Sequence, residues 1–410
     1  MPDHEIRGSL LRNHGGGHAP VSYLELFFDL VYVFAITQVS HTLLHHLSWG
    51  GFAQAIVLFL AVWWAWMYTT WAANWANPER VPVRLMLLGA MLSSLLMSVA
   101  LPLAFGHGAQ DRAAMFVACY VGLQIGRSLF MAWALWRDDR PAALTMARIA
   151  TWFTFSGTCW TAGVLVHDET SRLTLWAIAL AVEYLGPIGG YRIPGFGRSQ
   201  PSDWVISGSH MAERCALFII IALGEGVIVT GANYAGTPGS TTDTAAFLAA
   251  FTGSVLMWWL YFDVGAERGA RHIEHHAEPG RIARSAYTYL HMPIVAGIVI
   301  CAVADGLLFQ QARLPASTGL ILTQCGGLIT FLTGVALFKR FGSPLGNIPL
   351  SHIAGGALLL LLGGWAWLRP VPALGFVATT AAVMALVALW EWGSFHGGWQ
   401  DRLGRLLNRP

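Results

Sequence analysis

Two carboxylates open the first apolar segment of the chain. Glu25 and Asp29 are four residues apart, so on a helix they share one face. An ionised side chain in hydrocarbon costs several kcal/mol unless it is paired or wetted. Two carboxylates this close cannot both ionise cheaply, so the pair could hold a proton at neutral pH. Arg127, Arg148 or Arg214 could instead neutralise them.

Further ionisable residues lie in later apolar segments. His210 precedes Glu213 by three residues, and Arg214 follows at the start of the seventh segment. Glu225 lies about 15 residues into the same segment, at or beyond the bilayer midplane at ~1.5 Å per residue. Arg127 is roughly two-thirds of the way along the fourth segment. Such residues are candidates for a ligand or proton pathway, whereas a structural ion network is the competing interpretation.

Most acids of the apolar segments fall toward the predicted cytoplasmic side, and Asp305 alone lies near the outer face. Polar amides and an inner histidine could complete the pathway. The expected ligand or proton pathway consists of Glu25, Asp29, Gln38, Arg127, His210, Glu213, Arg214, Glu225, Asp263 and His291. No catalytic set and no metal site are expected.

Cofactor binding is a weaker alternative. Haem held by two histidines would need both at one depth on neighbouring helices, which leaves only His210, His291 and His352. A single histidine in a helix is more often a packing residue, so no cofactor is expected. The second segment carries five tryptophans, for which interfacial or lipid contact is the usual explanation: Trp63, Trp64, Trp66, Trp71 and Trp75.

Composition places the chain in a membrane. Of 410 residues, 55% are hydrophobic and only 11% are charged, against about 25% charged in soluble proteins. No basic stripe is dense enough for nucleic-acid binding. Nucleotide-binding and common hydrolase motifs are absent. An enzyme is therefore less expected than a binding or transport protein.

Twelve stretches are long and apolar enough to cross a bilayer. They are residues 23–42, 52–76, 83–105, 113–136, 144–166, 173–188, 211–234, 244–266, 284–309, 318–339, 349–368 and 371–395. Arginine and lysine concentrate in alternate loops, on the side of the N-terminus. The positive-inside rule then makes both termini cytoplasmic. The fold class expected is an all-α polytopic membrane protein.

Short similarities between the halves indicate an internal repeat. Trp63-Trp64-Ala-Trp66 resembles Trp258-Trp259-Leu-Tyr261, and Glu183 resembles Glu391. Two repeats of six spans each would have the same orientation. The predicted divisions are a polar cytoplasmic N-terminus (1–22), a first membrane half (23–188), a linker (189–210), a second half (211–395) and an amphipathic cytoplasmic tail (396–410).

Three stretches carry a family resemblance. They are YLELFFDLVYVFAITQVSH at Tyr23–His41, HMAER followed by IALGE between His210 and Glu225, and AYTYLHMP at Ala286–Pro293. Together they resemble the bacterial low temperature requirement A membrane proteins. The resemblance implies an integral membrane protein of about this length, and it carries no settled activity with it.

The sequence leaves three functions open. A multi-pass secondary transporter of the bacterial inner membrane, coupled to protons, fits the spans and the inward acids. A haem-, quinone- or lipid-binding protein or enzyme is the second. A lipid-binding structural or sensor protein linked to cold growth is the third. The expected partners are the lipid bilayer and an unknown small solute or proton, with a homodimer left open.

Overall fold

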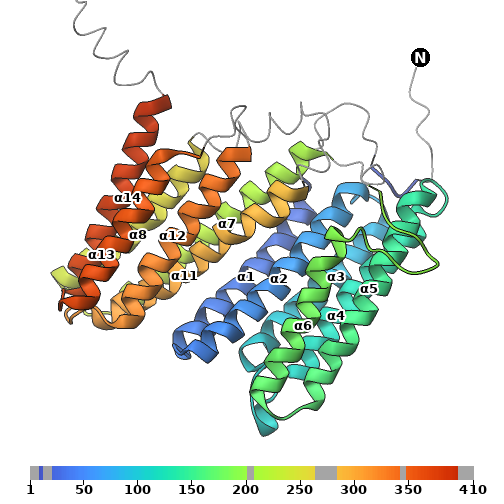
Figure 1. Cartoon of the computed structure of the whole chain (residues 1–410), viewed down its shortest axis with the longest axis horizontal. Coiled ribbons are helices and arrows are strands. Elements are labelled where there is room, and N and C mark those ends of the chain that lie inside the picture. The colour runs from blue at the N-terminus through green and yellow to red at the C-terminus, as the bar shows by residue number, and fades with distance from the viewer. Residues whose placement is uncertain (1–8, 13–20, 201–206, 264–283, 342–347, 396–410) are drawn as a thin grey trace, which may run out of the picture. The chain divides into compact units, whose positions relative to one another are not determined.

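The computed structural model describes residues 9–12, 21–200, 207–263, 284–341 and 348–395, and its helices are shown in Figure 1. The expected tail and most of the expected N-terminal segment lie outside these ranges. Helices α1 to α6 are Tyr23–His45, Trp49–Trp75, Val81–Ala100, Ala113–Leu135, Arg140–Leu165 and Glu169–Ile188. Helices α7, α8 and α11 to α14 are Gly208–Ala235, Thr241–Phe262, His291–Gln311, Thr318–Phe341, Leu350–Leu368 and Ala373–Phe395.

Each of the twelve expected segments overlaps one of these long α-helices, so the all-α membrane class is confirmed. Ten helices in the described ranges are long and apolar enough to cross a bilayer. The other two, α5 and α6, have the length but a more polar composition. α6 carries Arg172 and Glu183, and both side chains are buried in protein. Burial of these two charges against neighbouring helices keeps them away from the surface of α6.

The chain divides into two compact units, Met1–Arg214 and Cys215–Pro410, and the boundary falls inside α7. In the first unit, α1 packs on α2 and α3, while α3, α4, α5 and α6 pack in succession. α4 and α6 also contact α2. In the second unit, α11, α12, α13 and α14 pack in succession, and α12 and α14 contact α8.

Helix α2 forms the core of the first unit. Every residue from Ala61 to Ala76 is buried, including the five tryptophans, whose exposed fractions are all below 10%. The expectation that these rings lie at the lipid interface is therefore wrong for α2. Because α2 contacts helices on several sides, its sequence is apolar all round and lacks the single apolar stripe by which a buried helix face is usually recognised.

Candidate functional site

Glu25 is positioned by the way α1 begins. Ser22 caps the helix, its hydroxyl accepting from the Glu25 backbone N–H, while the Glu25 carboxylate accepts from the Ser22 backbone N–H at 2.8 Å. This reciprocal capping box points the carboxylate back across the helix start. Arg12 donates to the same oxygen, Oε2, at 2.7 Å. The other oxygen, Oε1, is left for partners on α7.

Helix α7 supplies those partners. His210 lies with its Nε2 2.9 Å from Glu25 Oε1, and Arg214 Nη1 donates to the same oxygen at 3.3 Å. Because His210 and Arg214 are four residues apart, both side chains leave one face of the helix. Glu25 therefore connects the N-terminal segment, α1 and the first turns of α7.

Asp29 lies one turn beyond Glu25 on the same face of α1. Arg214 binds the Asp29 carboxylate with two nitrogens: Nε donates to Oδ2 at 3.1 Å, and Nη2 donates to Oδ1. Trp66 of α2 donates its indole N–H to Oδ1 at 2.7 Å. A guanidinium matches a carboxylate in this two-pronged geometry, which is stronger than a single contact.

Asn74 of α2 fixes the orientation of His210. Its amide nitrogen lies 3.2 Å from His210 Nδ1 and also donates to the Ser207 carbonyl at 3.0 Å. Since the amide NH₂ can only donate, Nδ1 accepts and the ring proton is on Nε2, facing Glu25. The hydrogen-bond pattern thus assigns a neutral His210.

The ionic network (Arg12, Glu25, Asp29, His210 and Arg214) is balanced in charge, and all of its members except the half-buried Arg12 are buried. Two carboxylates face two guanidiniums, and the neutral imidazole adds no charge. The exposed fraction is 0% for Glu25, Asp29 and His210 and 1% for Arg214. A proton added to this network would leave an unbalanced charge in a medium where charge is costly.

Two other expected pathway residues of the first unit lie apart from these contacts. Arg127 is 4% exposed on α4 and donates to Thr69 Oγ1 at 3.1 Å and to Gln124 Oε1 at 2.6 Å. Gln38 is half-buried on α1. Glu213 accepts from the Val21 backbone N–H at 3.3 Å, next to the network.

The remaining expected residues belong to the second unit. His291 is buried, with Tyr261 Oη 2.9 Å from its Nε2 and the Ala286 carbonyl 3.1 Å from its Nδ1. Asp263 is exposed at the end of α8, and Glu225 is half-buried in α7. These three are not members of the ionic network.

The sequence did not single out Arg12, Trp66 or Asn74 for the network. Arg12 comes from a polar stretch before the first helix, and Trp66 and Asn74 come from a helix rich in aromatic and small residues. Their roles depend on helix packing. One signal in the sequence could have indicated a role for Trp66. A buried acid such as Asp29 requires a hydrogen-bond donor, which a neighbouring helix must supply.

His210 and His291 do not suit haem. Both ring nitrogens of His210 and of His291 already have hydrogen-bond partners, so neither has a nitrogen to offer iron without breaking a buried bond. Among the described residues, no group of three or more His, Cys, Asp or Glu side chains could hold a metal ion.

Comparison with known proteins agrees with the fold. Residues 20–389 match the family described as Bacterial low temperature requirement A protein. An uncharacterized protein of Rhizobium meliloti (strain 1021) is 36% identical over 396 residues, which cover 95% of each chain. No solved structure matches. The network-forming motifs fall within the matched range, and this multi-pass membrane protein belongs to the bacterial low temperature requirement A family.

Proposed function

We propose that the protein is a proton-linked secondary transporter of the bacterial inner membrane, in which His210 and its carboxylate partners take up and release the coupling proton. The observation that carries this proposal is a titratable, buried histidine in a charge-balanced network. Histidine is the side chain whose ordinary titration falls nearest to physiological pH. Its protonation would unbalance the network and favour a rearrangement of α1 against the first turns of α7.

A two-repeat construction supports this proposal, because many secondary transporters are built from repeats. The helix contacts of α2 to α6 recur, in the same order, among α8 and α11 to α14. Arg127 of α4 donates to the Ala65 carbonyl, and Lys339 of α12 donates to the Leu260 carbonyl. Ala65 and Leu260 are matched positions of the two aromatic motifs in the sequence.

The last helix of each unit carries an acid at a matched position, Glu183 in α6 and Glu391 in α14. Each acid lies close to the cation of its unit or to a residue that contacts that cation. Glu391 of α14 is 2.6 Å from Lys339 Nζ. Glu183 of α6 accepts from Tyr120, whose hydroxyl also accepts from Gln124, a partner of Arg127. We infer that α1–α6 and α7–α14 are two repeats of six spans with the same orientation.

The test uses liposomes that contain the purified protein and a trapped pH-sensitive dye, with the outside more acidic. Amino acids, sugars, nucleosides, carboxylates and organic cations are added in turn, outside or preloaded inside. At least one class should accelerate the pH change over protein-free liposomes. The same class should give no acceleration with His210→Gln, which keeps an N–H donor but does not titrate.

His167→Gln is the matched control, because His167 is exposed between α5 and α6. It should behave as the unmodified protein does. Solute-driven proton movement that survives in His210→Gln would remove His210 from coupling. The absence of any solute effect, with either direction of the solute gradient, would contradict proton-linked transport of these classes.

A further inference from the structure

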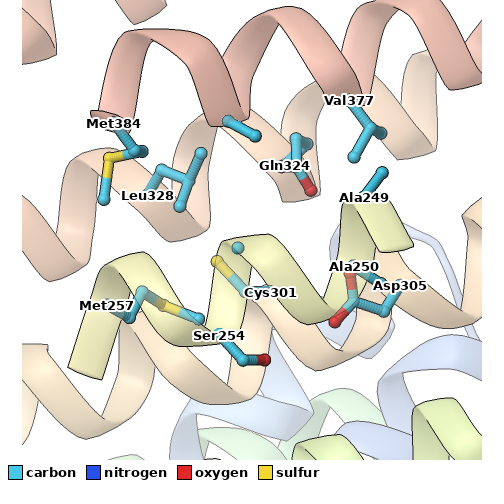
Figure 2. Close-up of a pocket in the computed structure, with 12 residues that line it drawn as sticks. Ala249, Ala250, Ser254, Met257, Cys301, Asp305, Gln324, Leu328, Val377 and Met384 are labelled. Carbon is cyan, nitrogen blue, oxygen red and sulfur yellow. The ribbon is translucent and has the colours of Figure 1, made fainter. Parts of the chain in front are cut away.

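One cavity-lining carboxylate of the second unit, Asp305, has no hydrogen-bond or ion-pair partner among the described residues. Asp305 is half-buried in the last two turns of α11, where it lines a cavity with residues of α8, α12 and α14. Figure 2 shows the Asp305 carboxylate beside this space, with Gln324 and Ser254 on neighbouring helices. Among the described residues, no hydrogen bond or ion pair reaches its oxygens.

The described residues that line the cavity beside Asp305 carry no positive charge. The cavity lining on α8, α12 and α14 has no Lys, Arg or His, and the one other titratable group of the lining is the thiol of Cys301, one turn back on α11. Two methionines, Met257 and Met384, make the far wall apolar. A carboxylate in such a place either recruits a cation or holds a proton.

The cavity decides between these occupants. Its volume for the centre of a water-sized molecule is about 10 Å³, close to the minimum for a single water. The side-chain oxygens available are those of Asp305, Gln324 and Ser254, whereas divalent cations take about six or more oxygen ligands. Gln324 donates its amide N–H to Thr380 at 2.8 Å, which leaves its carbonyl oxygen as an acceptor.

We propose that Asp305 is a proton-binding carboxyl that is protonated at neutral pH, a second proton site separate from the ionic network of the first unit. The protonated acid fits a lining of acceptors and apolar groups, since it can donate a hydrogen bond to a single water in the cavity. This inference stands on the cavity and the missing counter-charge. It holds whether or not the protein transports a solute, so a negative flux experiment leaves it intact.

Infrared difference spectroscopy of the purified protein in lipid discs tests the site, by following the C=O stretch of protonated carboxyl groups between neutral and alkaline pH. The unmodified protein should show this band at neutral pH and lose it at alkaline pH. Asp305→Asn should lack the Asp305 contribution. Asparagine has the shape of the protonated acid, so the midpoint of thermal unfolding should stay near that of the unmodified protein.

Asp168→Asn is the control. Asp168 is exposed ahead of α6, where its carboxylate accepts a hydrogen bond from the Ser171 backbone N–H at 2.7 Å, which favours the ionised form. Its replacement should leave the band unchanged. A band in Asp305→Asn as strong as that of the unmodified protein, or no band in the unmodified protein, would overturn the proposal.

Sodium provides a measurement that needs no variant. The neutral-pH band should be the same in sodium chloride and in choline chloride, because Ser254, Asp305 and Gln324 supply the few side-chain oxygens of the lining. Loss of the band in sodium chloride alone would show displacement of the proton by Na⁺ and would overturn the assignment of a proton as the occupant.

Discussion

At Asp29 the carboxylate accepts two hydrogen bonds from Arg214 and one from Trp66, and its residue is fully buried. Removal of one member of such a pair leaves the other charge buried without compensation, which costs more than the pair itself contributes. Loss of one charge from the network should therefore destabilise the folded protein more than loss of two opposite charges that pair with each other.

Arg214→Met should lower the stability of the folded protein by about 3–5 kcal/mol, the usual cost of breaking a buried ion pair. Adding Asp29→Asn to Arg214→Met should recover part of that loss, because the second change removes an uncompensated charge. Thermal unfolding in detergent measures both. The control is Arg112→Met, at an exposed arginine with no side-chain cap bond. Equal effects at the two arginines would contradict a buried network.

Tyr120 provides a second prediction at the scale of single residues. Its hydroxyl, 0% exposed, donates to Glu183 and accepts from Gln124. Tyr120→Phe keeps the ring but removes a hydrogen bond to a buried acid, so we expect a loss of about 1–3 kcal/mol. Tyr23→Phe, at a residue 92% exposed, should change the unfolding midpoint little. An unchanged midpoint for Tyr120→Phe would mean that Glu183 does not need this donor.

Residue types and spacing predicted some members of the network and missed others. Glu25 and Asp29 share a face because they are four apart, and His210 and Arg214 do so for the same reason. The pairing of these two faces depends on packing between helices some 185 residues apart. Spacing carries no information about such contacts, which explains why Asn74 was missed although it orients the histidine.

At the scale of helices, hydrophobic stretches predicted every long element, because the thickness of a bilayer fixes the length of an apolar run. The change of helix type at the start of the segment expected at 284–309 was not predicted. Residues Arg284–Leu290 form a π-helical turn, and α11 begins at His291. Pro293 has no backbone N–H for the carbonyl four residues earlier, and such a gap favours a local change of helix type.

Close packing of α11 on α12 depends on glycine. A Cβ added at Gly327 would lie 2.7 Å from Cys301 Sγ and 2.9 Å from the Cys301 backbone nitrogen. The neighbouring Gly326 has open space at the same position. Small residues at helix contacts let backbones approach in membranes, where lipid provides little hydrophobic drive for association.

Gly327→Ala should therefore lower the unfolding midpoint, because α11 and α12 must separate to admit the methyl group. Gly326→Ala should leave the midpoint unchanged or raise it, since alanine favours a helix over glycine by up to about 1 kcal/mol. Parallel thermal unfolding of the two variants makes the comparison. The opposite order of the two midpoints would contradict the described contact of α11 with α12.

At the scale of the whole molecule, the number of spans decides where each loop lies. Ten helices meet the apolar criterion in the described ranges, while α5 and α6 are long enough but have more polar sequences. If both cross the membrane, the loop between them lies opposite to the loops that flank the pair. If neither crosses, all three loops lie on one side.

Single cysteines placed in these loops separate the two cases. The background is a variant in which the five native cysteines, all buried or half-buried, are replaced by serine or alanine. His167→Cys, between α5 and α6, should react with a membrane-impermeant maleimide on intact cells. Arg137→Cys and Arg192→Cys, both exposed before α5 and after α6, should react only in inverted membrane vesicles. Labelling of all three positions from the same side would contradict twelve spans, because the polar helices α5 and α6 would then not cross the bilayer.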